Sequence, residues 1–324
     1  MSRMAPPIPV PRPVSPTDGD AATDRADADA FRLGIDHLLA PTPTTSQKQI
    51  EALQSELESL RSELNVLRRR DETLKYYMTR LDEELRLAAR LQQDFLPRTL
   101  PQVGPIHFHT LFRPAGYVSG DLFDVMRLDE THIGFFIVDA VGHGMPAALL
   151  TMFIKRALQT KEIFPGGYRL LPPEQTMALL NEALVEQNLS EATFATALYG
   201  YINTTTLEVT YSTGGHPPPL LLRAGEFKPC PSQGSLLGLF SGEAFTPGSF
   251  QLKPGDRLFL YSDGVEVGFS ADQAGDVGQW KQELLKRTAH SAEKMLTEFA
   301  ELMDAECGSL QPKDDLTMIV VEVR

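Results

Sequence analysis

The sequence predicts an α+β protein in which antiparallel sheets are covered by helices, preceded by a long coiled-coil helix and a disordered tail. Three observations lead to this prediction. From about residue 105 onward, short β-branched segments follow one another at hairpin spacing, interrupted by pairs of helical segments. Before them, apolar residues recur every three and four positions, as in a coiled coil. Residues 1–45 show no sustained period.

The composition limits the class of protein. A chain of 324 residues can form one sizeable domain with additional segments. A net charge of -13 and a pI near 5.0 argue against a nucleic-acid surface and against docking on anionic membranes. Cys230 and Cys307 form no close pair, which argues against a disulfide framework or a zinc site. No signal peptide and no apolar stretch of membrane length is visible, so we expect a soluble, cytoplasmic protein.

The first segment, residues 1–45, is rich in Pro, Thr, Ala and Asp, and we expect it to be disordered. It contains one short apolar motif between Phe31 and Leu39. Two interpretations are open for this motif. It is either an amphipathic turn that docks on a partner, or an apolar piece of the tail with no such role.

The second segment, residues 46–97, carries a regular heptad that predicts a parallel homodimer. Position a holds Ile50, Leu57, Leu64, Asp71, Met78 and Leu85, and position d holds Leu53, Leu60, Leu67, Leu74, Leu81 and Ala88. The alternative is a single long helix that lies on its own globular domain, although so narrow a stripe suits a partner helix better. Pro41 and Pro43 stand where a basic-zipper protein would need a basic helix, so we expect no nucleic-acid partner.

The third segment, residues 98–324, is predicted to form the globular domain, since Pro97 and Pro101 end the long helix. Strands are expected at 106–113, 121–128, 132–139, 194–203, 206–212, 218–223, 247–252, 257–262 and 316–323. Helices are expected at 145–160, 173–189 and 277–306.

Four acidic islands lie at the edges of the expected strands. They read Ser119-Gly120-Asp121-Leu122-Phe123-Asp124, Val138-Asp139-Ala140-Val141-Gly142-His143-Gly144, Tyr261-Ser262-Asp263-Gly264 and Lys313-Asp314-Asp315-Leu316-Thr317. Carboxylates in such places are costly to bury alone, and they suit the oxygen-seeking ions Mg²⁺ and Mn²⁺. The chain has no G-x-S-x-G, H-E-x-x-H or Walker-type motif. These observations favour a two-metal hydrolase.

Five motifs in order give the chain a family resemblance. They are S-G-D-L-F-D, D-A-V-G-H-G, T-G-G-H-P-P-P-L, L-Y-S-D-G-V and D-D-L-T. This series resembles the metal-dependent serine/threonine phosphatase superfamily, and within it the bacterial stage II sporulation protein E-like group that regulates sigma factors. The resemblance spans about residues 105–324. It implies a central antiparallel β-sandwich flanked by helices, an αββα arrangement, with two Mn²⁺ or Mg²⁺ ions at one edge.

The resemblance also implies roles for particular residues. Asp139 is expected to bridge both metal ions, assisted by the carbonyl of Ala140. Asp121, Asp263 and Asp314 are expected to complete the ligand set, and Asp315 and Asp124 are further candidates. The alternative for any one Asp after a strand is a helix cap or a turn residue. For four Asp residues in this order, that alternative is a poor explanation.

Three basic residues are weaker candidates. His143 is either a general acid for the departing alkoxide or a structural residue of its turn. Arg113 is the nearest candidate for a phosphate clamp. His216, within Gly214-Gly215-His216-Pro217, is expected to be structural.

The predicted reaction is hydrolysis of a phosphoserine or phosphothreonine on a protein. The resemblance implies that the substrate is a phosphorylated STAS-type anti-sigma-factor antagonist. Two rival hypotheses are a pseudo-phosphatase that binds without turnover and a dimeric adaptor with residual activity. We also expect a regulatory protein on the tail or the coil, whose signal reaches the site because residues Leu85 to Leu96 press on the helices at 145–189.

Overall fold

The computed structural model of the chain describes residues 45–189, 193–268, 278–306 and 314–324. The expected disordered tail with its apolar motif, and Cys307, therefore lie outside the described residues. The chain divides into two units, residues 1–76 and 77–324, and helix α2 (Thr45–Phe95) contributes to both. None of the described helices has the length and the apolar character that crossing a membrane requires.

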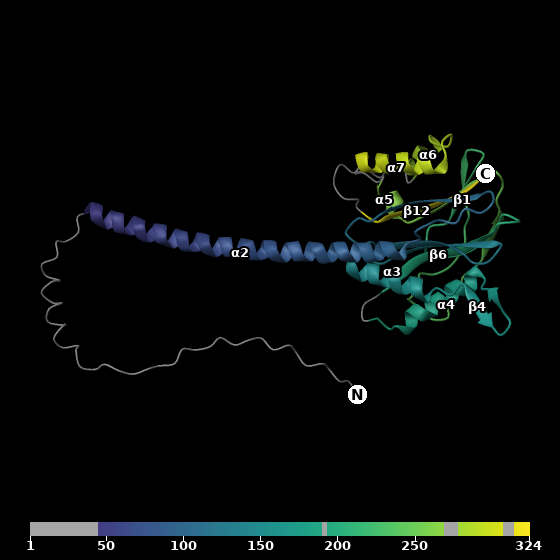
Figure 1. The fold of residues 1–324 in the computed structure, drawn as a ribbon, viewed down its shortest axis with the longest axis horizontal. Coiled ribbons are helices and arrows are strands. Elements are labelled where there is room, and N and C mark those ends of the chain that lie inside the picture. The colour runs from purple at the N-terminus through teal and green to yellow at the C-terminus, as the bar shows by residue number, and fades with distance from the viewer. Residues whose placement is uncertain (1–44, 190–192, 269–277, 307–313) are drawn as a thin grey trace, which may run out of the picture. The chain divides into compact units, whose positions relative to one another are not determined.

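Two antiparallel five-stranded sheets form the centre of the second unit (Figure 1). The first sheet has the order β1 (Ile106–Arg113), β12 (Leu316–Val323), β11 (Arg257–Tyr261), β8 (Leu220–Arg223), β9 (Glu226–Pro229). The second has the order β10 (Gly248–Gln251), β7 (Glu208–Gly214), β6 (Ala195–Asn203), β3 (His132–Ala140), β2 (Asp121–Arg127). Strands from the two ends of the domain thus lie in the same sheet, as β1 and β12 do along their whole length.

Helices cover the outer face of each sheet, which confirms the expected αββα arrangement (Figure 1). α3 (Met145–Ala157) and α4 (Pro173–Glu186) pack on the second sheet, and α6 (Gln279–Leu285) and α7 (Ala292–Glu306) pack on the first. Between the sheets, alternate residues of both form one apolar core, with Phe135 and Leu258 fully buried. Each fully buried side chain of this kind stabilises the fold by about 2 kcal/mol.

The structure differs from the sequence prediction in one divided helix and in four elements that were not predicted. The single helix expected at 277–306 is two helices, α6 and α7, separated by the turn 286–291. The hairpin β4 (Lys161–Phe164) and β5 (Gly167–Leu170) was not predicted, and neither were β9 and α5 (Gly264–Gly268). The unpredicted strands β4, β5 and β9 have four mostly exposed residues each, so they carry no apolar face that would mark them in the sequence.

The last turns of α2 pack on the globular domain. From Leu85 onward its partly or fully buried residues recur at helical spacing, and Gln92 is 2% exposed. The a and d positions from Ile50 to Leu74, in contrast, are all exposed where they hold leucine or isoleucine. The end of the helix therefore lies on its own domain, as the second interpretation predicts. Its beginning presents an exposed apolar stripe, and the pairing of that stripe with a second copy stays a prediction.

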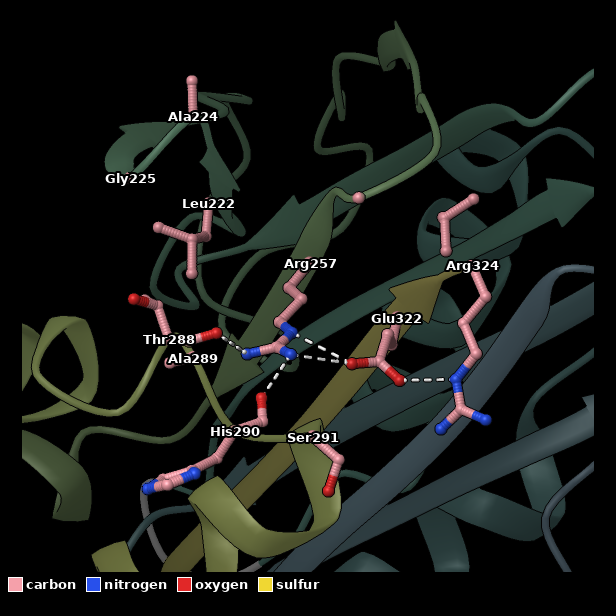
Figure 2. Close-up of a pocket in the computed structure, with 12 residues that line it drawn as sticks. Leu222, Ala224, Gly225, Arg257, Thr288, Ala289, His290, Ser291, Glu322 and Arg324 are labelled. Atoms are coloured by element: carbon pink, nitrogen blue, oxygen red, sulfur yellow. Dashed lines mark hydrogen bonds and ion pairs between the residues drawn. The ribbon is translucent and has the colours of Figure 1, made fainter.

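A concavity of about 600 Å³ lies where β11 begins and β12 ends (Figure 2). Arg257 projects there and donates hydrogen bonds to the backbone oxygens of Thr288 and His290, and its guanidinium lies 2.9 Å from Glu322. Arg324 donates to the other oxygen of Glu322, at 2.8 Å. These contacts tie the turn before α7 to the first sheet, so the charged groups of this concavity have structural partners.

Candidate metal centre

Asp121 and Asp139 stand directly opposite each other in neighbouring strands of the second sheet. Asp121 begins β2, Asp139 is the penultimate residue of β3, and the two are register partners in the antiparallel ladder. Side chains paired in this way have Cβ atoms about 5 Å apart. Both project toward the first sheet, because they alternate with Leu122 and Val138, which pack on the helix side. The sheet therefore holds two carboxylates side by side, and Asp121 is only 1% exposed.

The buried carboxylate of Asp121 is held by two hydroxyl groups of the first sheet. Its Oδ2 accepts hydrogen bonds from Ser262 Oγ at 2.7 Å and from Thr317 Oγ1 at 2.6 Å. Ser262 in turn accepts the backbone N–H of Thr317 at 3.0 Å. Ser262 and Thr317 were not among the site residues predicted from the sequence, although both lie in the acidic islands. The sequence signal for them is the position of their hydroxyl groups, since Ser262 precedes Asp263 and Thr317 follows two residues after Asp315.

Asp263 and Asp314 come from the first sheet, where β11 ends and just before β12 begins. The two segments lie so close that a Cβ on Gly264 would meet the carbonyl oxygen of Asp315 at 1.9 Å. Only glycine therefore fits after Asp263 at this crossing. The structure thus brings Asp121, Asp139, Asp263 and Asp314 to one edge of the sandwich.

Asp315 is next to this group but is engaged elsewhere. Its carboxylate accepts the backbone N–H of Ala115 at 2.7 Å and that of Gly120 at 2.6 Å. Its side chain is buried, and Asp314 Oδ1 accepts its backbone N–H. Asp315 therefore fixes the loop that leads into β2, and through it the position of Asp121.

The carboxylates of this cluster repel one another. Burial, and after it the charge of Asp139, raises the pKa of Asp121 well above its usual range. Burial, and then the charges of Asp263 and Asp314, raises the pKa of Asp139 to about 7. Desolvation and the charge of Asp314 also raise the pKa of Asp263. None of these residues forms an ion pair with Lys or Arg in the part of the chain that the structure describes.

Such a donor set fits hard divalent cations, which take carboxylate oxygens and supply the missing positive charge. Among the described residues, no group of three or more Asp, Glu, His or Cys side chains is already arranged to hold a metal ion. Within the cluster, Asp121 is buried and Asp263 and Asp314 are exposed.

Asp124 lies apart from the cluster. It is three residues beyond Asp121 in β2, so its side chain projects from the opposite face of the sheet. There its carboxylate lies 2.7 Å from Lys155 Nζ of α3. This pair ties α3 to the sheet, and the structure offers Asp124 no place among the candidate ligands.

The remaining candidates surround the cluster. His143 is exposed in the turn between β3 and α3. The carbonyl oxygen of Ala140 lies close to Gly120, since a Cβ atom on Gly120 would be only 3.2 Å from it. Arg113 ends β1, but its guanidinium pairs with Asp304 of α7. His216 is buried, with Nδ1 at 2.8 Å from Thr196 Oγ1, and burial lowers its pKa to about 3. It is therefore neutral at physiological pH, in keeping with a structural role.

Sequence analysis missed the contribution of Gln92, at the end of α2. Its side chain donates to the carbonyl of Ser119 at 2.7 Å and accepts the N–H of the same residue at 2.8 Å. Lys155 of α3 donates to the carbonyl of Phe95. The end of α2 is thus attached both to the loop before Asp121 and to the helix that follows Asp139. The signal in the sequence was a glutamine at a heptad a position, where most other heptads hold an apolar residue.

Comparison with known proteins agrees with this geometry. The family model described as stage II sporulation protein E (SpoIIE) matches residues 129–324. The chain is 27% identical over 252 residues to the phosphoserine phosphatase RsbU of Bacillus subtilis, covering 77% of this chain and 73% of RsbU. It is 30% identical over 246 residues to the phosphoserine phosphatase RsbP of the same organism, covering 74% of this chain and 58% of RsbP.

Among solved structures, the PP2C domain of SiaA from Pseudomonas aeruginosa has the same fold, with a TM-score of 0.64 at 20% identity. The match covers 76% of this chain and 98% of that domain. The fold and the site define a serine/threonine phosphatase of the metal-dependent PP2C class. The chain belongs to the SpoIIE family within that class.

Proposed function

We propose that this chain hydrolyses phosphoserine or phosphothreonine on a regulatory protein with two Mn²⁺ or Mg²⁺ ions. The observation that carries the proposal is the convergence of Asp121, Asp139, Asp263 and Asp314 at one edge of the sandwich without a neighbouring Lys or Arg ion pair among the described residues. Two bound ions would neutralise the phosphate oxygens and lower the pKa of the attacking water. All four positions are retained, which argues against the pseudo-phosphatase alternative.

The residues of the chain have distinct parts in this mechanism. Asp139 is the register partner of Asp121, and the charge of Asp263 acts on its carboxylate, which supports the expected role of Asp139 as the bridging ligand. Ser262 and Thr317 orient the carboxylate of Asp121 by two hydrogen bonds. Such fixed ligands hold their geometry during turnover, which is the contribution a protein makes to metal catalysis.

The proposed substrate is a phosphorylated STAS-type anti-sigma-factor antagonist. The family resemblance suggests this substrate, and the names of RsbU and RsbP as phosphoserine phosphatases support the phosphoserine part of it. The chain has a net charge of -13, so its overall field does not attract an acidic partner. We therefore expect specificity to come from shape and apolar contacts near the site. A cytoplasmic location is part of the same proposal.

We further propose that the segment 46–97 forms a parallel homodimer through α2. The a and d side chains from Ile50 to Leu74 form an exposed apolar stripe, and Glu56 and Glu63 occupy g positions. In a parallel pair they face Arg61 and Arg68 at the e positions of the second copy. In an antiparallel pair, glutamate would face glutamate and arginine would face arginine. A regulatory protein that binds the tail or the coil can then act on the site through Gln92 and Phe95.

The test is an assay of the purified full chain on para-nitrophenyl phosphate with Mn²⁺. We expect turnover that EDTA abolishes and that Asp139→Asn loses. Asp124→Asn is the matched control, since it changes the same side chain on the other face of the same sheet. Turnover that survives EDTA, or that Asp139→Asn retains, would contradict the proposal.

A further inference from the structure

A groove of about 600 Å³ adjoins the carboxylate cluster. Asp314 and Asp315 line it, together with the turn Gly142–Gly144, which includes His143. The rest of its lining is largely apolar: Leu85, Tyr117, Val118 and Met145. The groove is therefore continuous with the site where a phosphate ester would react, but its chemistry is different from that of the site.

Helix α2 forms one wall of this groove. Leu85 is half-buried there, at the point where the helix begins to pack on the globular domain. On the other side, Tyr117 is 41% exposed and Met145 is 37% exposed, so both present apolar surface to solvent. An exposed apolar surface that adjoins a reactive centre is typical of a place where a partner binds.

Side-chain contacts fix this wall in position. The Tyr117 hydroxyl donates a hydrogen bond to Asp82 of α2, and Asp82 also accepts one from Arg86 at 2.7 Å. The guanidinium of Arg86 lies 5.9 Å from the centre of the Tyr117 ring, within the range of a cation–π contact. The helix and the loop 115–118 are thus joined beside the groove.

We propose that this groove binds an apolar side chain next to the phosphorylated residue of the protein substrate, and that Leu85 of α2 is a specificity-determining residue. The inference rests on the proposed function, since it names how that substrate is recognised. The phosphate reaches the cluster at Asp314, and the neighbouring chain of the substrate extends along the walls. Because the groove offers apolar contact, two aspartates and no Lys or Arg among its described lining residues, an aliphatic side chain fits it better than an acidic one.

The experiment uses the full chain with Mn²⁺ and a set of phosphoserine peptides. In the reference peptide, alanine flanks the phosphoserine on both sides, and each other peptide replaces one flanking alanine by leucine. We expect leucine at one or two positions to raise kcat/KM about tenfold over the reference peptide. In Leu85→Ser the ratio between the leucine peptide and the reference peptide should fall to about one.

The matched control is Leu87→Ser, which makes the same substitution at an exposed position two residues further along the helix. This variant should keep the tenfold ratio. Should Leu85→Ser fold poorly, as judged by its melting temperature, Leu85→Met and Tyr117→Ala test the same two walls, and Tyr117→Ala should also lower the ratio.

Three results would overturn the inference: a wild type without a leucine preference, a Leu85→Ser variant that retains it, or a Leu87→Ser variant that loses it equally. Loss of all peptide turnover in Leu85→Ser and Leu85→Met would assign Leu85 to the integrity of the site, against a role in specificity. Absence of turnover on para-nitrophenyl phosphate in the wild type would instead contradict the proposed function itself.

Discussion

The charged side chains at the two ends of β11 and β12 differ in whether they have partners of opposite charge. Where β11 begins and β12 ends, Arg257 and Arg324 both contact Glu322, and backbone carbonyls take the remaining donors of Arg257 (Figure 2). At the other end of the same strands, Asp263 and Asp314 stand with Asp139 and Asp121, and no Lys or Arg pairs with these four among the described residues. At one end the buried carboxylate has cationic partners; the other end accumulates negative charge.

This difference separates a structural site from a functional one. Charges that serve stability are paired, because an unpaired buried charge costs several kcal/mol. A set of carboxylates with raised pKa values is destabilising by itself, and such a cost is typical of catalytic and ligand-binding centres. The contrast therefore predicts that changes at the two ends affect different properties.

The largest expected effect is that of Asp139→Asn on catalysis. Loss of the expected bridging ligand should lower metal-dependent kcat/KM on para-nitrophenyl phosphate by about a thousandfold or more, since metal ions supply several kcal/mol of transition-state stabilisation. Without metal, the same variant should melt higher than the wild type, because one repelling charge is removed. Differential scanning calorimetry in EDTA measures this second effect. A variant that melts lower would show that Asp139 stabilises the fold.

Glu322→Gln should have the opposite profile. It leaves Arg257 and Arg324 without their anionic partner, and Glu322 is only 7% exposed, so we expect a loss of about 3 kcal/mol of unfolding free energy. Turnover per folded molecule should stay within about twofold of the wild type. Urea titration gives the first quantity and the phosphatase assay the second. Asp94→Asn, which breaks an exposed pair with Arg98, is the control and should cost less than about 1 kcal/mol.

A third prediction concerns pH. The folded protein raises the pKa of Asp139 from its ordinary value of 3.8 to about 7, so between these pH values the folded state holds a proton that the unfolded state releases. Lowering the pH from 8 to 5 should therefore stabilise the metal-free protein at this residue. The melting temperature of the wild type should rise by a few degrees relative to Asp139→Asn. Identical pH profiles of the two proteins would refute this assignment, and saturating Mn²⁺ should reduce the difference.

The smallest effect is expected for Asp124→Asn. Its pair with Lys155 is partly exposed, so its loss should cost about 1 kcal/mol or less. Turnover should remain within about threefold of the wild type, because Asp124 projects away from the cluster. A loss comparable to that of Asp139→Asn would mean that Asp124 reaches the site after all.

The sequence predicted the sandwich and the four converging aspartates because both leave periodic or motif-like traces. The apolar run Ile133–Val138 is typical of a buried strand, and each of the four Asp residues stands at or next to one end of an expected strand. The supporting contacts left weaker traces. Gln92 and Asp315 act through hydrogen bonds to backbone groups of residues 119 and 120, and these contacts depend on loop geometry that no spacing encodes. Likewise, Asp124 shares the motif of Asp121, and only strand alternation places it on the opposite face.

The central claim is that the cluster around Asp139 binds divalent cations, and a direct count of bound metal tests it. Wild type and Asp139→Asn would be dialysed against Mn²⁺ and the bound ions counted by elemental analysis, with Asp124→Asn as the control. We expect two ions per chain in the wild type and in Asp124→Asn, and fewer in Asp139→Asn. Equal metal content in the wild type and Asp139→Asn, or none in a folded wild type at millimolar Mn²⁺, would contradict the claim.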